Sequence, residues 1–362
     1  MLRHPRLARL VAATVIVGAL GVAAVAPAGA GAGATVLYDQ FGSPKGLTFD
    51  GNGQAIVSQG AFGPPAPLQR FFLSGPKTGT TQNLSADLGL NSVSYAAAKN
   101  SFWLLGGDGR LLRKPVGKFR VFVADLYDFA ANNPDPYNTN GEPEESNPFN
   151  VAALPSGDAL VADAAANSLL RVTPHGGIHI VARFASELVS TDHLPAGPPP
   201  FIDAESVPTS VAIGPDGAYY VGELKGFPFR PGSSRIWRIP AGTTGAVCSA
   251  DPAVPAQNCT SAGDGYTSIA SIAFGAGDDD SDGSDEMYVF EYAEEGVGVF
   301  EEQCFGPAAA CPPAVLLEVD GDEREELAKG ELYEPGTVAV SGDDVYVTDR
   351  VLTGGRLLVI DD

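Results

Sequence analysis

Four carboxylate side chains each follow a short apolar segment that has the composition of a β-strand. They end the segments LVAD, YVGE, YVFE and VYVTD, and they are Asp163, Glu223, Glu291 and Asp349. Polar side chains also stand near the starts of the preceding apolar segments: Asn147, Asn150, Ser206 and Ser268. Carboxylate and amide oxygens are hard ligands that suit Ca²⁺. A fold that gathers these positions at one mouth would allow a calcium site there, with Asp163 and Glu223 among its ligands. The alternative is that these side chains cap strand ends and bind water.

An acidic stretch, GDDDSDGSDE, offers a second place for a cation. Asp278, Asp280 and Asp282, followed by Gly283, fit the start of a calcium-binding loop. The rest of an EF-hand is missing, because the twelfth position from Asp278 is Val289 and no helix pair flanks the stretch. A solvated acidic turn is the alternative, and an ion bound here would have a structural role.

A complete catalytic constellation does not emerge from the sequence. The histidines are His4, His175, His179 and His193. Only His193, in the loop STDHLPAGPPPF, is placed where it could reach the mouth. No serine–histidine–aspartate arrangement has a recognisable motif around it, and no glycine-rich phosphate loop appears. Glu223 could serve as a general base, although nothing singles it out.

The loop KGFPFRPGSS follows Glu223 and could add a binding surface. Lys225, Phe227, Phe229 and Arg230 would project from the same face as the carboxylates. Aromatic side chains mixed with charges are typical of such surfaces. The alternative is that Phe227 and Phe229 tuck under the loop and pack against a neighbouring unit.

These segments belong to a unit that repeats six times. Each copy has a turn-prone start, a strand of small and β-branched residues, a Gly/Asp/Asn turn, and a second apolar strand. The copies align on Leu47, Val93, Val151, Val211, Ile272 and Val338, at steps of 46 to 66 residues. Third strands follow in GRLLRKPV, NSLLRVTP, SRIWRIPA and GRLLVI, and fourth strands in FRVFVADL and IHIVARF.

Six repeats of four antiparallel strands predict an all-β fold, a six-bladed β-propeller similar to NHL repeats and gluconolactonases. The last copy supplies three strands, and a lone strand from Thr35 can complete that blade and close the ring. Small residues on the first strands fit this arrangement, since those strands crowd the central channel. Helices should be scarce, because no segment has sustained helical periodicity.

The N-terminus reads as an export signal. Arg3, Arg6 and Arg9 precede an apolar run from Leu10 to Pro27, which ends in small residues. We expect residues 1–30 to be a secretory signal peptide and residues 31–362 to form one propeller domain. A membrane anchor is the alternative for the first segment, and no later stretch is apolar enough to span a bilayer.

Charge and cysteine content agree with an exported protein. The net charge of -22 disfavours nucleic acid as a partner. An even number of cysteines in an exported chain indicates disulfides, and proximity favours Cys248–Cys259 and Cys304–Cys311 among the three possible pairings.

Two stretches carry a resemblance to a known family. ESNPFNVAALPSGDALVADAAANSLLRV and SVPTSVAIGPDGAYYVGELKGFPFRPGSSRIWRI look like segments of the ScyD/ScyE family of secreted propeller proteins. The resemblance extends from about residue 34 to the end, although the fifth copy departs from it with its acidic insertion and cysteine-bearing loop. It implies export and a propeller, and it implies no established activity.

The sequence therefore favours a secreted binding or scaffold protein without enzymatic activity, whose partner is an extracellular small molecule or protein. The binding face would carry Asn147, Asn150, Asp163, Glu223, Lys225, Phe227, Phe229, Glu291 and Asp349. The alternative function is a Ca²⁺-dependent hydrolase of lactones or similar esters, by analogy with lactonases of the same fold.

Overall fold

The computed structural model describes residues 33–195, 197–275, 286–306 and 310–361. The expected signal peptide and the acidic residues Asp278, Asp280 and Asp282 lie outside these ranges.

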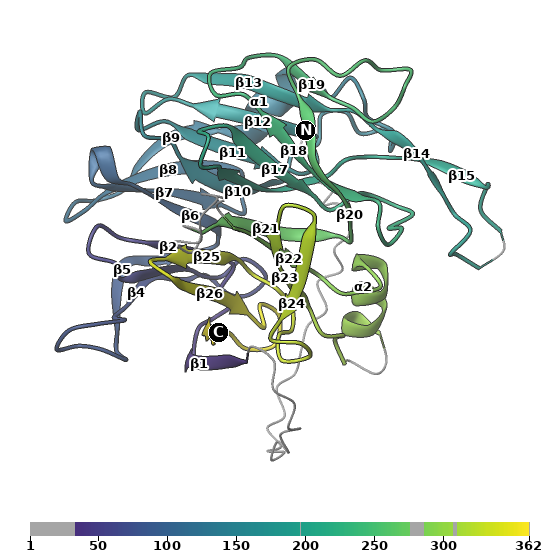
Figure 1. Cartoon of the computed structure of the whole chain (residues 1–362). Coiled ribbons are helices and arrows are strands. Elements are labelled where there is room, and N and C mark those ends of the chain that lie inside the picture. Colours follow the sequence, from purple (N-terminus) through teal and green to yellow (C-terminus); the bar gives the residue numbers. More distant parts are fainter. Residues whose placement is uncertain (1–32, 196, 276–285, 307–309, 362) are drawn as a thin grey trace.

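Six antiparallel sheets of four principal strands form the protein, as the repeats predict (Figure 1). Blade 1 consists of β2 (Gly46–Phe49), β3 (Ala55–Ser58), β4 (Ala66–Phe71) and β5 (Thr81–Leu88). Blade 2 consists of β6 (Leu90–Ala96), β7 (Ser101–Gly106), β8 (Arg110–Pro115) and β9 (Val121–Asp125). Blade 3 consists of β10 (Pro148–Ala153), β11 (Ala159–Asp163), β12 (Ser168–Val172) and β13 (Ile178–Phe184).

The other three blades have the same strand order. Blade 4 consists of β16 (Pro208–Ile213), β17 (Tyr219–Glu223), β18 (Ser234–Ile239) and β20 (Thr260–Tyr266). Blade 5 consists of β21 (Ile269–Phe274), β22 (Met287–Glu291), β23 (Val315–Asp320) and β24 (Glu323–Leu327). Blade 6 consists of β25 (Val338–Ser341), β26 (Asp344–Asp349), β27 (Arg356–Ile360) and β1 (Ala34–Tyr38).

Ring closure by the start of the chain is confirmed. Strand β1 pairs antiparallel with β27, with Ala34 opposite Ile360 and Val36 opposite Leu358. Figure 1 shows β1 beside the C-terminal end of the described chain. All six alignment positions, from Leu47 to Val338, lie on the first strand of their blade.

Each pair of neighbouring blades shares an apolar core. Alternate residues of a strand face opposite sides of its sheet, so Trp103 of β7 packs toward blade 3 while Phe102 packs toward blade 1. Both side chains are fully buried. The six interfaces each have such a cluster, and hydrophobic burial on both faces of every sheet holds the blades together.

Polar side chains on the first strands connect one blade to the next. Ser210 of β16 accepts a hydrogen bond from the backbone N–H of Ile272 in β21 at 2.9 Å. Ser92 does the same for Val151, and Asn150 does the same for Val211. Because the first strand has an unpaired edge toward the channel, these contacts satisfy backbone groups that would otherwise lack partners.

The expected crowding of the first strands is also present. A Cβ at Gly46 of β2 would lie 2.8 Å from backbone atoms of Ser92 and Val93 in the next blade. Only a residue without a side chain fits at that approach.

Other elements are few. Helix α1 (Leu126–Asn132) follows blade 2, and helix α2 (Val297–Phe305) lies between β22 and β23. Strand β19 (Ala246–Cys248) adds to β13 in parallel, and the hairpin β14–β15 (Glu187–Ser190 and Phe201–Ala204) extends away from the ring (Figure 1). The disulfides Cys248–Cys259 and Cys304–Cys311 form as proximity predicts.

Candidate functional site

The second strand of a blade ends beside the start of the first strand of the same blade. Asp163 lies opposite Pro148, Glu223 opposite Pro208, and Glu291 opposite Ile269, so each second strand ends beside the start of the first strand of its blade. We call the side of the ring where the second strands end the mouth face. Asp349, at the end of β26, belongs to the same set.

The four carboxylate side chains are buried, and each accepts a hydrogen bond from the segment that precedes the first strand of its own blade. Asp163 accepts a hydrogen bond from the backbone N–H of Asn147 at 2.7 Å, and Glu291 accepts one from Thr267 at 2.6 Å. The N–H of Tyr333 donates to Asp349 at 3.1 Å. All four side chains are buried, with exposed fractions between 0% and 5%. We call these four side chains latches, because each connects the end of a second strand to the segment that leads into the same blade.

Blade 1 has an equivalent latch that the sequence reasoning missed. Gln59, directly after β3, accepts a hydrogen bond from the N–H of Gly42 at 2.7 Å. Its position at the end of the segment AIVSQ is the signal that could have identified it.

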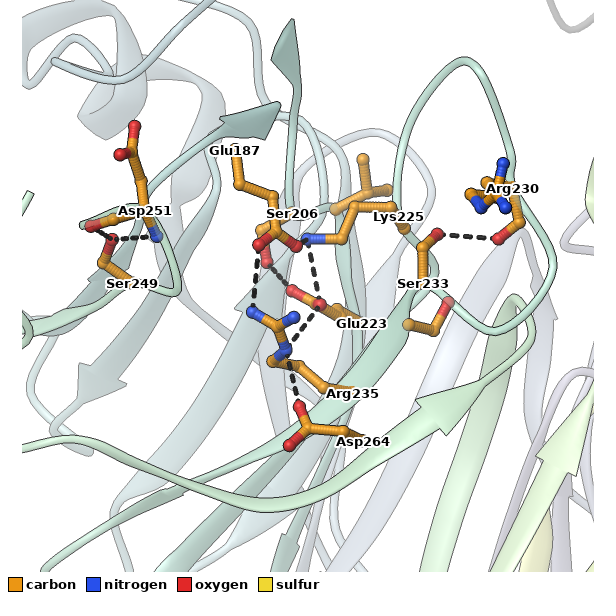
Figure 2. A network of polar contacts seen from close by, with 12 residues as sticks. Glu187, Ser206, Glu223, Lys225, Arg230, Ser233, Arg235, Ser249, Asp251 and Asp264 are labelled. Carbon is orange, nitrogen blue, oxygen red and sulfur yellow. Dashed lines mark hydrogen bonds and ion pairs between the residues drawn. The ribbon is translucent and has the colours of Figure 1, made fainter. Parts of the chain in front are cut away.

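Glu223 and Lys225 belong to a buried ion network (Figure 2). The Lys225 ammonium lies 3.0 Å from Glu223 Oε1 and 2.7 Å from Glu187 Oε1. The indole N–H of Trp237 and the hydroxyl of Ser206 both donate to Glu223 Oε2. Both charged side chains are thereby paired, and Glu223 Oε2 is also hydrogen-bonded, which offsets part of the cost of burying the charges.

The network continues outward to the surface (Figure 2). Arg235 pairs with Glu187 at 3.2 Å and with Asp264 at 2.9 Å. Because Glu187 begins β14, these contacts fix the base of the projecting hairpin to blade 4.

The other carboxylates differ in electrostatics. Asp349 forms an ion pair with Arg356. Burial raises the pKa of Asp163, and burial raises the pKa of Glu291 to about 7. No ion pair within 4 Å joins Glu291 to a described cation, which explains why desolvation dominates its pKa.

Within the described residues, no group of three His, Cys, Asp or Glu side chains is arranged to hold a metal ion. The latching carboxylates each bond within their own blade, and Asn150 connects two blades. Calcium binding by Asp163 and Glu223 therefore stays a prediction.

An apolar pocket opens on the mouth face, at positions that follow the latches. Ala164, Leu224 and Tyr292 each come directly after a latching carboxylate, and Val351 comes two residues after Asp349. The pocket has a volume of about 150 Å³, and residues from five of the six blades line it. Sequence reasoning included Asn147, which lines the pocket, and missed these apolar neighbours.

Helix α2 covers one side of this pocket. Phe300, Glu301 and Phe305 of α2 line it, and the Phe300 ring contacts Tyr292 edge-on with centroids 5.1 Å apart. Phe229 packs beneath α2: a Cβ at Gly298 would lie 3.2 Å from its side chain.

Of the residues predicted for the loops of the binding face, some are packed against other parts of the protein and some are exposed. The Phe227 ring is 50% exposed beside Phe229, with centroids 5.8 Å apart. His193 reaches the carbonyl oxygen of Pro228 with its Nε2 at 3.0 Å, and Arg230 pairs with Asp192. These contacts tie the His193 loop to the Phe227–Phe229 loop, away from the pocket lining.

Comparison with solved structures supports the propeller fold. A glucose dehydrogenase has a TM-score of 0.53 at 15% identity, covering 91% of this chain and 99% of that protein. The soluble aldose sugar dehydrogenase of Escherichia coli gives 0.52 at 15% identity, with 91% and 99% covered. Virginiamycin B lyase of Staphylococcus aureus gives 0.50 at 13% identity, with 92% and 99% covered. At these identities the likeness concerns the fold alone.

No protein-family model and no curated protein sequence matches this chain. The chain thus belongs to the class of six-bladed β-propellers, whose members with similar structures include enzymes. Neither described helix is long and apolar enough to cross a bilayer.

Proposed function

We propose that this chain is a secreted, ScyD/ScyE-like binding protein that takes a small, largely apolar molecule in the mouth-face pocket. The observation that carries the proposal is the pocket itself, which five blades and α2 line mainly with apolar side chains. Small-molecule sites are typically concave and apolar, with few polar groups. The two disulfides are compatible with an exported protein.

The state of the carboxylates favours binding over hydrolysis. A Ca²⁺-dependent lactonase needs oxygen ligands free to converge on one ion. Asp163, Glu223 and Asp349 instead accept hydrogen bonds or ion pairs from their own blades. Hydrolysis of a lactone by purified protein, dependent on Ca²⁺ and lost in Asp163→Asn, would favour the enzyme instead.

Titration with a neutral hydrophobic fluorophore, N-phenyl-1-naphthylamine, tests the binding proposal. We expect saturable fluorescence enhancement that Ala164→Phe abolishes, because the larger ring fills the pocket beside Asp163. The matched control is Ala253→Phe on an exposed loop, which should bind as the wild type does. Thermal unfolding of both variants establishes that they are folded. Equal enhancement in Ala164→Phe and the control would contradict the proposal.

A further inference from the structure

Among the described residues that line the pocket there is a single carboxylate, and it has no partner among them. This side chain is Glu301, the only charged one of the described lining residues. Within the described ranges the side chain of Glu301 makes no hydrogen bond and no ion pair. Although the residue is exposed at the rim, partial burial raises the pKa of its carboxyl, and burial is the only cause of that change.

Aromatic rings surround the same space. Five of the lining residues are aromatic: Phe62, Phe149, Tyr292, Phe300 and Phe305. The faces of such rings attract ammonium groups, and cages of rings are the usual site for quaternary or alkylated ammonium ligands. A carboxylate at the rim of such a cage adds the opposite charge.

One of these rings already contacts a lysine amine of the protein. The Lys45 amine lies 3.1 Å from the centroid of Phe149 and donates to the carbonyl oxygen of that residue at 3.0 Å. Lys45 does not line the pocket, and no lysine, arginine or histidine is among its described lining residues. Among the described residues, therefore, no cation lines the pocket with Glu301 or forms an ion pair with it.

Resting on the binding function proposed above, we propose that the ligand is an organic cation. Its apolar part lies among the aromatic rings, and its alkylated ammonium group lies against the Glu301 carboxylate. The acidic character of the whole chain, with a net charge of -22, further favours the approach of a cation over an anion.

The test compares two ligands of the same shape. Benzyltrimethylammonium carries a positive charge, and neopentylbenzene is its neutral carbon isostere. Both are titrated against the full mature chain by displacement of N-phenyl-1-naphthylamine. We expect the cation to bind about tenfold more tightly than the isostere, equivalent to about 1.4 kcal/mol.

Substitutions at neighbouring positions of α2 test whether the Glu301 side chain causes the preference for the cation. Glu301→Gln should reduce the affinity for the cation about tenfold and leave the affinity for the isostere unchanged. Glu302 is also exposed and is not among the lining residues, so Glu302→Gln should alter neither affinity. Phe305→Leu should reduce the affinity for the cation more than the affinity for the isostere, because the substitution removes the aromatic ring and keeps an apolar side chain.

The outcomes separate the two proposals. Equal affinity for both ligands, or no effect of Glu301→Gln on the cation, would overturn the organic-cation inference and leave an apolar binding site. Failure of the fluorophore and of both ligands to bind would overturn the binding function itself. The predicted pattern, with Glu302→Gln unchanged, would support both.

Discussion

The amine of Lys45 lies over the ring of Phe149 and donates a hydrogen bond to the carbonyl oxygen of the same residue. Lys45 precedes β2 in blade 1, whereas Phe149 is in β10 of blade 3, so the contact bypasses blade 2. Lys45 is only 4% exposed. The pair joins two blades that do not share a sheet interface, next to the mouth-face pocket.

Replacing Lys45 should change how stability depends on pH. Burial lowers the pKa of Lys45 well below its usual 10.5. The uncharged amine is favoured in the folded state, so its contribution is present above about pH 10.5 and is lost as pH falls through the folded-state pKa. We expect the difference in the free energy of unfolding, Lys45→Met minus wild type, to be more positive at pH 7 than at pH 10. Urea denaturation at both pH values measures this, and a difference that does not vary with pH would contradict it.

Ser210→Ala should weaken the contact between blades 4 and 5. The substitution removes the acceptor for the buried N–H of Ile272 and leaves that group without a partner. We expect a loss of about 1–3 kcal/mol in the free energy of unfolding. Ser261→Ala, on the exposed part of β20, is the matched control and should change stability by less than about 0.5 kcal/mol. Equal stability of the two variants in urea would count against the inter-blade role.

Glu223→Gln should be strongly destabilising for a single, nearly isosteric change. It removes the negative charge that faces the buried Lys225 ammonium, which then depends on Glu187 alone. We expect a loss of about 3 kcal/mol, measured by thermal and urea unfolding.

The comparison variant for Glu223 is Asp264→Asn, at the exposed end of the same network. Its side chain is 65% exposed, and solvent screens its contact with Arg235. We expect a loss below about 1 kcal/mol. If both variants lose the same amount, the buried pair does not carry the stability of the network.

Glu291 should make the protein less stable as the solution becomes neutral. Its folded-state pKa of about 7 lies above the ordinary value of 4.5, mainly because the carboxyl is buried. Its contribution is therefore fully present below pH 4.5 and is lost as pH rises through about 7, by about 3 kcal/mol in total. Glu291→Gln should remove this loss, whereas exposed Glu294→Gln should keep it. Unfolding free energies measured from pH 4 to pH 8 give the comparison.

The fold could be predicted because its determinants repeat along the chain. Positions such as Val151 and Val211 recur in six copies, and each is surrounded by the strand and turn residues that the architecture requires. The location of the carboxylates could be predicted for the same reason. The direction in which the carboxylate side chains point could not be predicted, because the residues that Asp163 and Glu223 contact lie partly in loops that differ between blades.

The pocket was harder to predict for two physical reasons. Its lining residues, such as Ala164 and Leu224, are ordinary apolar residues in sequence and acquire meaning only when five blades converge. Helix α2 adds Phe300 and Glu301 from a cysteine-bearing loop, and that segment is too short to show helical periodicity. The sequence therefore indicated the polar latch residues as a site and did not indicate the apolar residues that follow them.

The pairing of β1 with β27 has a consequence for the order of events during biosynthesis. Strand β1 is among the first parts of the described chain to leave the ribosome, and β27 is among the last. The edge of β1 therefore stays unpaired while some 300 residues are synthesised. Blades 1 to 5 contain all their strands before β27 is made, but the circle can be completed only once β27 is present. Any chain cut short before that point would leave β1 without its partner, and this unpaired strand edge would be available for pairing with another molecule.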